Sequence, residues 1–402
     1  MKKLIALLLA ALMVFGMAAC SNEQGGEKKE ADIKIGLICL HDENSTYDLN
    51  FLNGMYEAVE NLGLDPEKNL IIKKNIPEGN ECYEAAADLA DAGCDVIFAN
   101  SFGHEDFMIQ AAKEFKDVEF CHATGTKAHT EKLANFHNAF AAIYEGRYLA
   151  GIAAGMKLNE MIAAGEITAE EAVMGYVGAF TYAEVKSGYT SFYLGAKSVC
   201  PSVTMKVQFT GSWYDETAEK EAATLLINSG CVLISQHADS MGAPTACETA
   251  GVPNVSYNGS TQAACPNTFI VSSRINWAPY YEYMVKCVLE DKAIDTDWTG
   301  TIATGSVVLT EVNEKAAAAG TAEAIEKAKA ELAAGTLKVF NTANFTVNGE
   351  ALTSYMADVD TDAAYEKDTE VISEGYFHES EYRSAPYFDL DIDGIELLNT
   401  AF

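Results

Sequence analysis

The sequence predicts an α/β protein made of two doubly wound, parallel-sheet lobes joined by a hinge. Three observations predict this fold. Short apolar runs alternate with helical patterns from residue 33 onward, this alternation restarts near residue 146, and 402 residues suffice for two to three domains. Apolar residues make up 49% of the chain, which is enough for more than one core.

The first lobe is predicted over residues 33–145. The run IKIGLICL at 33–40 has the length and composition of a buried strand, and the stretch 49–62 carries apolar residues at a helical spacing. Further strands are expected at 69–76, 94–99 and 118–123, and further helices at 81–92 and 107–115. This βαβαβ order predicts a parallel sheet with helices on both faces.

The second lobe is predicted over residues 146–270. Strands are expected at 173–180, 204–209, 232–236, 254–257 and 268–272, and helices at 144–159, 183–199, 216–228 and 244–250. The first of these helices contains Gly146, Gly151 and Gly155, which predict close helix packing.

The rest of the chain is expected to complete the two lobes. Residues 275–325, with a helix at 279–290, are assigned to the first lobe, and residues 335–402 to the second. A helix is expected over 314–334 and a strand over 337–340. The pair Asn348-Gly349 predicts a hairpin turn, and the tail is expected to add edge strands rather than form a third domain.

The charge balance excludes several functions. There are 27 Lys and Arg residues against 59 Asp and Glu residues, a net charge of −32. Such a surface repels nucleic acid and anionic lipid. The sequence has no GxSxG, Walker or HExxH motif, so no catalysis, cofactor or metal is expected.

The N-terminus predicts export. Lys2 and Lys3 precede an apolar stretch over residues 4–14, as in a signal peptide covering residues 1–20. The following Met17-Ala18-Ala19-Cys20 resembles the lipobox of bacterial lipoproteins. That resemblance implies acylation of Cys20, a flexible tether over 21–32, and attachment by lipid to the extracytoplasmic face of the cell membrane. An ordinary signal peptide with an incidental cysteine is the alternative.

Nine other cysteines remain, an odd number for an exported chain. Four of them, Cys39, Cys94, Cys121 and Cys231, lie in or beside apolar strand-like runs, where a free thiol packs as a small hydrophobe. Cys247 and Cys265 flank a loop-rich stretch, so a disulfide between them stays open.

Several motifs resemble the basic membrane protein (Bmp) family, the purine-nucleoside-binding lipoproteins of ABC importers. Asp42 and Phe51 match the spacing of that family's Asp after the first strand and the Phe of its Asp-x-Ser-Phe-Asn segment. The runs at 147–151, 175–178 and 211–215 resemble its YLAG, GFVGG and Gly-Ser-Trp/Phe-x-Asp motifs. The Asp-x-Ser-Phe-Asn segment itself differs from the family pattern at two positions. Asn50 replaces the Ser, and Leu52 replaces an Asn that contacts the ligand.

The resemblance implies a fold like that of type I periplasmic binding proteins, with a purine nucleoside or nucleobase held between the lobes. Phe51 and Trp213 would clamp the purine faces, and Asp42, with Asn44 or His41, would accept from its edge. Asp239 would hold the ribose, but no matching Lys is evident, so a free nucleobase is also open. The remaining candidates, from loops that follow strands, are Tyr47, Phe102, Gly103, Tyr182, Asn258 and Arg274.

Two of these residues have structural alternatives. Phe51 fits the apolar spacing of its helix and could belong to the core, and Asp42 could be a helix N-terminal or turn carboxylate. The predicted partners are the ligand and an ABC permease, and a monomer is expected. Three alternatives remain open: the same fold binding a sugar or another metabolite, an extracellular nucleoside hydrolase, and a structural surface lipoprotein.

Overall fold

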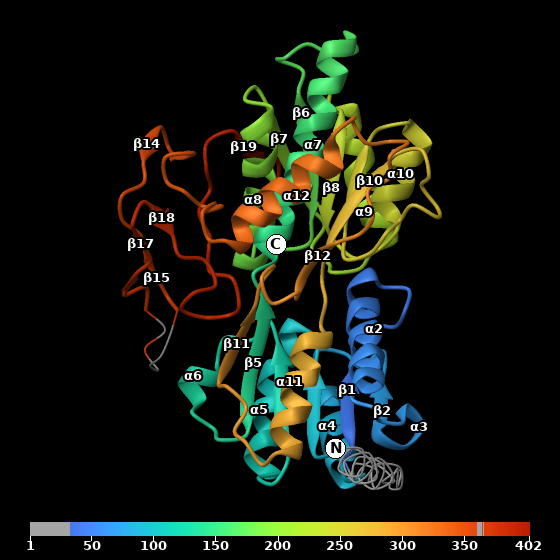
Figure 1. Ribbon diagram of the computed structural model, residues 1–402, viewed down its shortest axis with the longest axis vertical. Coiled ribbons are helices and arrows are strands. Elements are labelled where there is room, and N and C mark those ends of the chain that lie inside the picture. Colours follow the sequence, from blue (N-terminus) through green and yellow to red (C-terminus); the bar gives the residue numbers. More distant parts are fainter. Residues whose placement is uncertain (1–32, 360–363, 365) are drawn as a thin grey trace, which may run out of the picture. The chain divides into compact units, whose positions relative to one another are not determined.

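Two parallel sheets, one in each lobe, organise the protein. The computed structural model describes residues 33–359, 364 and 366–402, and the two lobes lie within them (Figure 1). The predicted signal peptide, Cys20 and the tether lie outside the described residues. None of the helices in the described ranges is long and apolar enough to cross a membrane.

The sheet of lobe 1 has six parallel strands in the order β11-β5-β4-β3-β1-β2. Ile35 of β1 pairs with Leu70 on one side and Val96 on the other, so the central strand is hydrogen-bonded at both edges. The strands are β1 (Ile35–Ile38), β2 (Leu70–Lys73), β3 (Val96–Ala99), β4 (Glu119–Ala123), β5 (Phe136–Ala141) and β11 (Asp297–Gly300).

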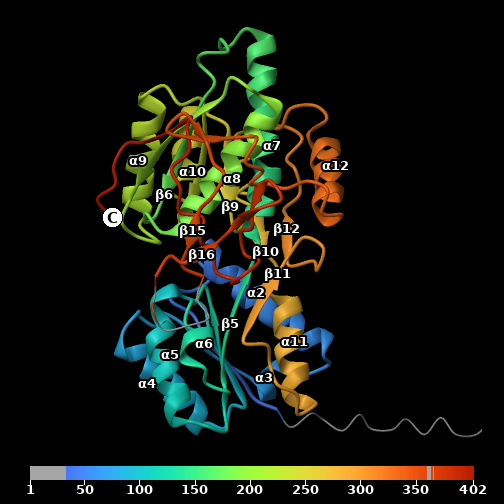
Figure 2. The same ribbon diagram turned by 90° about the vertical axis from the view of Figure 1, so that its left-hand side faces the viewer.

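Helices cover both faces of this sheet, as the alternating pattern predicts (Figure 2). One face packs on α4 and α5 through an apolar cluster that includes Leu89, Ile97 and Met108. The other face carries α2 and α11, where Phe98 meets Trp277 and Tyr281. The helices of lobe 1 are α2 (Thr46–Asn61), α3 (Pro66–Asn69), α4 (Asn80–Asp91), the 3-10 turn η1 (Phe102–His104), α5 (Glu105–Glu114), α6 (Ala128–Glu131) and α11 (Ala278–Leu289).

The sheet of lobe 2 has seven strands in the order β12-β10-β9-β8-β6-β7-β19. All neighbours are parallel except β12, which pairs antiparallel with β10. The strands are β6 (Val173–Gly178), β7 (Thr204–Phe209), β8 (Leu233–His237), β9 (Asn254–Tyr257), β10 (Phe269–Ile275), β12 (Val307–Leu309) and β19 (Ile395–Leu397).

Helices α7 and α8 pack backbone to backbone in lobe 2. A Cβ atom on Gly151 would lie 2.0 Å from the carbonyl oxygen of Phe192, and one on Gly195 would lie 2.0 Å from that of Tyr148. Glycine is therefore required on both helices, which confirms the close packing predicted for the first. The helices of lobe 2 are α7 (Ile143–Ala164), α8 (Ala183–Val199), α9 (Glu216–Asn228), α10 (Gly242–Ala250) and α12 (Thr321–Ala333).

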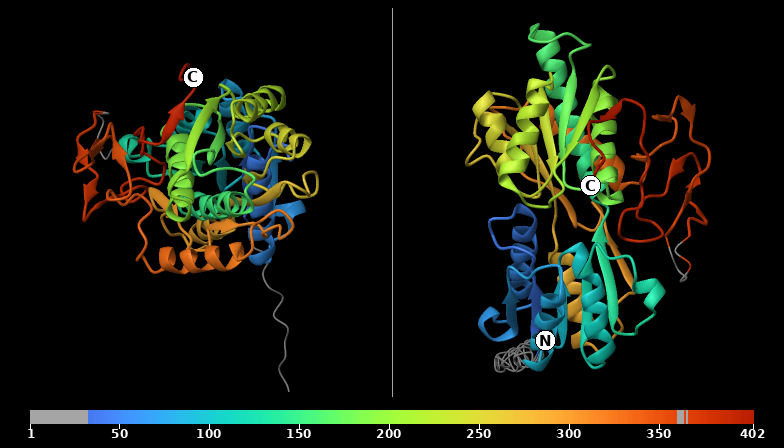
Figure 3. Two further views of the ribbon diagram at one scale, coloured as in Figure 1. Left: turned by 90° about the horizontal axis from the view of Figure 1, so that it is seen from above. Right: turned by 180° about the vertical axis from the view of Figure 1, so that it is seen from behind.

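The C-terminal residues 338–402 lie along one side of both lobes (Figures 1 and 3). Their strand β19 extends the sheet of lobe 2 beside β7, as expected of an edge strand. Ser384 donates its backbone N–H to Asp297 of lobe 1 at 2.9 Å, and Lys186 of lobe 2 pairs with Asp391 at 2.7 Å. This segment also contains β13 (Thr346–Val347), β14 (Glu350–Ala351), β15 (Met356–Ala357), β16 (Thr369–Glu370), β17 (Ile372–Ser373) and β18 (Tyr376–Phe377).

Local expectations for the tail are partly confirmed. Strands β13 and β14 form a hairpin whose turn residues Asn348 and Gly349 have φ values of 53° and 79°, as the Asn-Gly signal predicts. The strand expected at 337–340 is wrong: Val339 and Phe340 are both buried in a turn, so neighbouring side chains face the core together. The helix expected over 314–334 begins only at Thr321, after Gly320 with φ of 80°.

The nine cysteines of the described ranges are buried free thiols, including Cys247 and Cys265. The disulfide left open between these two is therefore absent from this part of the chain. Burial raises the pKa of the Cys247 thiol to about 12, which keeps it protonated and unreactive.

Candidate functional site

A narrow cleft lies where the carboxyl ends of the two sheets face each other. The chain segments that follow β1, β3 and β4 line it from lobe 1, together with the start of α2. The segments at the ends of β7, β8 and β9 line it from lobe 2, together with the start of α8. The lining residues are Leu40, His41, Tyr47, Asp48, Ser101, Phe102, Thr124, Glu184, Trp213, His237, Asp239 and Tyr257.

The lobes touch directly at one edge of this cleft. Thr46, in the first turn of α2, donates both its backbone N–H and its hydroxyl to the carbonyl oxygen of Asp239, each at 3.1 Å. Asn50 of α2 donates to Asn258 at 3.3 Å, and Asn258 donates to the Asp239 carboxylate at 3.1 Å. The structure is therefore a closed form, held by hydrogen bonds between the two lobes.

Asp48 is the buried acceptor on the lobe 1 side. Its Oδ1 accepts from the backbone N–H of His41 at 3.1 Å and from Asn100 Nδ2 at 2.7 Å. Its Oδ2 makes no hydrogen bond among the described residues but lies 3.5 Å from His41 Nδ1, and the side chain is 1% exposed. A buried carboxylate oxygen left in this state is ready to accept from a ligand.

Asn100, at the end of β3, fixes Asp48 in place. Its side-chain oxygen accepts from the backbone N–H of Leu40 at 3.0 Å, so it joins the loop after β1 to the loop after β3. Burial alone raises the pKa of Asp48, but the hydrogen bonds from His41 and Asn100 help to lower it below its ordinary value. Asp48 is thus held ionised inside the cleft.

Asp239 is the buried carboxylate on the lobe 2 side. Burial, followed by the charges of Glu219, Asp48 and Glu184, raises its pKa well above the ordinary value. Among the residues that the structure describes, no lysine or arginine lines the cleft. In the described residues, the buried carboxylates of the closed cleft therefore have no cationic side chain beside them in the lining.

Aromatic rings enclose the cleft from both lobes. Phe102 of lobe 1 lies 5.5 Å from Tyr182 of lobe 2, measured between ring centroids. Trp213 packs edge-on against Phe180 at 5.0 Å and tilts toward Tyr182 at 6.0 Å. Trp213 is partly exposed and lines the cleft, so its face is available to a flat ligand.

Five of the residues predicted from the sequence line the cleft, namely His41, Tyr47, Phe102, Trp213 and Asp239. Two more support it: Asn258 holds the Asp239 carboxylate, and Tyr182 contacts Phe102 and Trp213.

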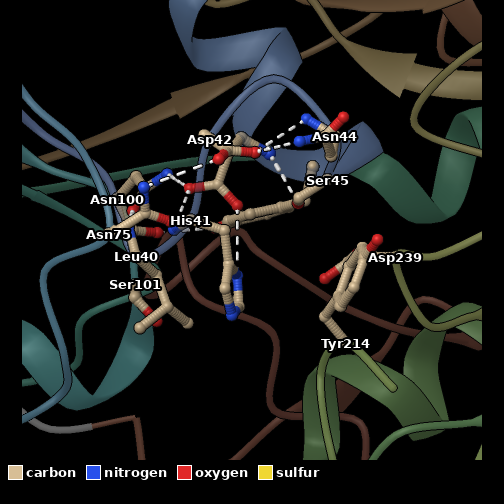
Figure 4. A network of polar contacts seen from close by, with 12 residues as sticks. Leu40, His41, Asp42, Asn44, Ser45, Asn75, Asn100, Ser101, Tyr214 and Asp239 are labelled. Carbon is tan, nitrogen blue, oxygen red and sulfur yellow. Dashed lines mark hydrogen bonds and ion pairs between the residues drawn. The ribbon is translucent and has the colours of Figure 1, made fainter. Parts of the chain in front are cut away.

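The others do not reach the cleft, and these assignments are corrected. Phe51 is fully buried and stacks on Trp277 at 4.4 Å, so it belongs to the core of lobe 1. Asp42 is a half-buried turn residue whose carboxylate accepts from Asn44, which is itself exposed (Figure 4). Arg274 lies in β10 outside the cleft lining.

Gly103 is likewise part of a turn rather than of the lining, because its N–H is bound to Glu78 at 2.8 Å. The loop that carries His41 and Asp42 nevertheless faces lobe 2. The His41 and Tyr214 rings approach to 5.5 Å across the opening, as Figure 4 shows beside Asp239.

The sequence analysis did not select Asp48, Glu184, Tyr257 or His237 as site residues. A signal existed for Asp48, since it begins the run Asp48-Leu49-Asn50-Phe51-Leu52, which parallels Asp-x-Ser-Phe-Asn. No comparable motif marks Glu184, Tyr257 or His237.

Comparison with known proteins decides the family. The model of the Bmp family, described as PnrA-like ABC transporter substrate-binding proteins, matches residues 35–337. The chain belongs to the Bmp family. It is therefore an ABC transporter substrate-binding protein that acts outside the cytoplasm, and its family consists of solute-binding proteins rather than enzymes.

Relatives of this Bmp-family chain include named transport proteins. It is 32% identical over 281 residues to a purine-binding protein of Brucella abortus, covering 69% of this chain and 75% of the relative. It is 34% identical over 212 residues to a putative ABC transporter glucose-binding protein of Haloferax volcanii, covering 52% and 50%. It is 25% identical over 254 residues to the nucleoside-binding protein BmpA of Lactococcus lactis, covering 60% and 66%.

Solved structures share the fold. An ABC transporter solute-binding protein from Aeropyrum pernix has a TM-score of 0.64 at 16% identity, covering 77% of this chain and 93% of its own. One from Conexibacter woesei has a TM-score of 0.60 at 18% identity, covering 76% and 98%. These matches confirm the predicted type I fold of the Bmp-family chain.

Proposed function

We propose that this protein is a lipid-anchored receptor that delivers a purine nucleobase or nucleoside to an ABC permease. The observation that carries the proposal is the buried Oδ2 of Asp48, which makes no hydrogen bond within the described residues and shares a closed inter-lobe cleft with the partly exposed ring of Trp213. A purine has N–H groups on its edge and two flat faces, so it meets both features. The relative from Brucella abortus named as a purine-binding protein supports the same ligand class.

Binding is coupled to closure because the two features come from different lobes. Trp213 belongs to lobe 2, while Asp48, Tyr47 and Phe102 belong to lobe 1. Stacking of a base on one aromatic side chain contributes about 1–3 kcal/mol. A ligand that touches both lobes shifts the equilibrium to the closed form, which is the form that a permease can distinguish from the empty receptor.

The anchor is the second part of the proposal. Acylation of Cys20 after removal of residues 1–19 would tether the mature protein, as a monomer, to the outer face of the cell membrane. Cys20→Ser is expected to abolish incorporation of an alkyne-labelled fatty acid and to release the protein into the soluble fraction. A C20S variant that is still labelled would refute the anchor while leaving the ligand proposal intact.

The ligand experiment uses the protein from Ser21 to Phe402. A denatured sample is analysed by mass spectrometry for co-purified small molecules, beside a thermal-shift series with adenine, adenosine, guanosine, inosine, hypoxanthine, glucose and ribose. Ligand at about a hundred times its Kd stabilises by about 2.7 kcal/mol. Stabilisation by a purine supports the proposal, whereas a response to a sugar alone, or no response to any purine, overturns the proposed ligand class.

A further inference from the structure

A buried arginine lies behind the lobe 2 wall of the cleft. Arg147 of α7 is 0% exposed, and its Nη2 donates to Tyr176 Oη at 2.6 Å, Ser235 Oγ at 3.2 Å and the Gln236 carbonyl at 3.1 Å. Its guanidinium also lies 4.7 Å from the ring centroid of Tyr257, which lines the cleft. Within the described ranges Arg147 forms no ion pair with a carboxylate.

The hydroxyl of Tyr176 connects this arginine to His237. Tyr176 Oη lies 3.3 Å from His237 Nδ1. Burial raises the pKa of Tyr176 to about 12, so its hydroxyl keeps its proton, and burial lowers the pKa of His237, so its ring is neutral. The close approach is possible because Gly188 of α8 faces the ring: a Cβ there would lie 2.6 Å from Nδ1.

The direction of these hydrogen bonds follows from counting protons. Arg147 can only donate, so Tyr176 Oη accepts from it. The Tyr176 proton then needs an acceptor, and His237 Nδ1 is the acceptor within reach. A buried O–H left unpaired is unfavourable, so Nδ1 carries no proton and the ring proton resides on Nε2.

The surroundings of Nε2 lead to the same assignment. Nε2 lies 3.6 Å from Glu184 Oε1, where an N–H is attracted to the carboxylate and a lone pair is repelled. At that separation it has no hydrogen-bond partner in the described part of the chain, although it is buried at the cleft. The N–H is attracted to Glu184 but makes no hydrogen bond to it at 3.6 Å, so a ligand acceptor can compete for it.

We propose that Arg147 and Tyr176 form a positioning relay that holds His237 in its Nε2–H tautomer, so that lobe 2 presents a donor, His237 Nε2–H, directly beside an acceptor, Glu184. The ligand that fits this pair has a hydrogen-bond acceptor next to a donor, as in a heteroaromatic ring nitrogen beside an exocyclic amino group. Asp48 on the opposite lobe accepts another N–H. This inference on specificity rests on the proposed function, but the tautomer itself does not.

The tautomer is measured first, without ligand. Long-range ¹⁵N–¹H spectra of the histidine side chains distinguish a protonated Nε2 from a protonated Nδ1. We expect the Nε2–H form of His237 in the native protein and a mixture of tautomers in Tyr176→Phe. The matched control is Tyr189→Phe, because Tyr189 packs on the Tyr176 ring at 5.8 Å without contacting His237. Nδ1–H in the native protein overturns the relay, whether or not purines bind.

The ligand arm compares adenine with its deaza analogues, each of which replaces one ring nitrogen by C–H. The 1-deaza and 7-deaza forms lose an acceptor beside the amino group, whereas the 3-deaza form loses one elsewhere. We expect one of the first two to bind roughly tenfold more weakly and the third to bind as adenine does. Equal affinity for all three analogues would show that His237 makes no hydrogen bond to a ring nitrogen beside the amino group.

Two substitutions of His237 show which of its ring nitrogens distinguishes adenine from its deaza analogues. The amide nitrogen of Gln can replace Nε2, and that of Asn can replace Nδ1. His237→Gln is therefore expected to keep the preference among the deaza analogues, and His237→Asn to lose it. If His237→Asn keeps the preference and His237→Gln loses it, the proposed tautomer is wrong. If the native protein shows the Nε2–H tautomer but binds no adenine analogue, only the purine ligand is refuted.

Discussion

The carbonyl oxygen of Asp239 in lobe 2 accepts two hydrogen bonds from Thr46 in lobe 1, from its N–H and its hydroxyl, each at 3.1 Å. The same aspartate is tied by its carboxylate to Asn258, which accepts in turn from Asn50 of lobe 1. Contacts of protein with protein thus stabilise the closed form in addition to any contacts with ligand. The affinity for ligand therefore depends on residues that need not touch it.

Removing the Thr46 hydroxyl is expected to weaken binding without altering the cleft lining. Thr46→Val keeps the shape and the backbone donor but loses one hydrogen bond, a change of about 0.5–1.5 kcal/mol, or roughly a two- to tenfold rise in Kd. Calorimetric titration measures it. Thr224→Val is the control, since that exposed hydroxyl bonds only within α9. An unchanged Kd would show that this contact does not contribute to closure.

Asp48 and Asp42 are expected to respond differently to the same substitution. Asp48→Asn retains one acceptor for the His41 N–H and Asn100 but replaces Oδ2, which makes no hydrogen bond in the described residues, by an NH2 group. We therefore expect a loss of about 1.5–3 kcal/mol in binding a ligand N–H. Asp42→Asn changes a half-buried turn outside the cleft lining and should alter Kd less than about twofold. Equal losses in the two variants would contradict the assignment of the acceptor to Asp48.

The fold could be predicted because it depends on local patterns. Strands such as β1 and β3 are buried on both faces of their sheet, so they appear as short continuous apolar runs, and the hairpin follows from Asn348-Gly349. The expected strand at 337–340 failed because an apolar run does not reveal whether its side chains alternate or gather on one side.

For the site, the sequence indicates which loops to consider but not which of their side chains face the cleft. The segment after β1 lies at the cleft, but the choice between Asp42 and Asp48 depends on Asn100, which is far away in the sequence. Similarly, the spacing of Phe51 fits both a clamp and a helix core. Trp277, which decides for the core, comes from a helix more than two hundred residues later.

Substitution of Phe51 is expected to lower the stability of the fold, whereas substitution of Trp213 is expected to weaken ligand binding. Phe51→Ala removes a fully buried ring that stacks on Trp277, so it should lower the free energy of unfolding by about 3–5 kcal/mol. Trp213→Ala removes a partly exposed ring from the cleft and should cost about 1–3 kcal/mol of purine binding, most of which Trp213→Phe should restore. Denaturant unfolding and titration measure the two quantities. If the folded fraction of Phe51→Ala lost affinity as much as Trp213→Ala, the clamp would include both rings.

The pH dependence of stability is expected to reflect Glu379, in the C-terminal segment. Its side chain is buried, with Oε1 accepting from the Tyr387 N–H at 3.0 Å and Oε2 unpartnered within the described residues. Burial raises the pKa of Glu379 to about 8. The folded state therefore keeps a proton that the unfolded state loses at its ordinary pKa, about 4.3. Stability from this group is complete below that value and is lost as pH rises toward 8.

Glu379→Gln removes that titration. We expect a melting temperature close to native at pH 5 and higher than native at pH 8.5, by roughly 2–5 °C, because the neutral amide avoids ionisation at a buried site. Burial also raises the pKa values of Glu145 and Glu219 to about 7, so the native curve slopes for several reasons, and only the difference between variant and native isolates Glu379. The exposed Glu350→Gln serves as the control. Native and Glu379→Gln curves that stay parallel from pH 5 to 8.5 would mean that Glu379 has the same proton affinity folded and unfolded, despite its burial.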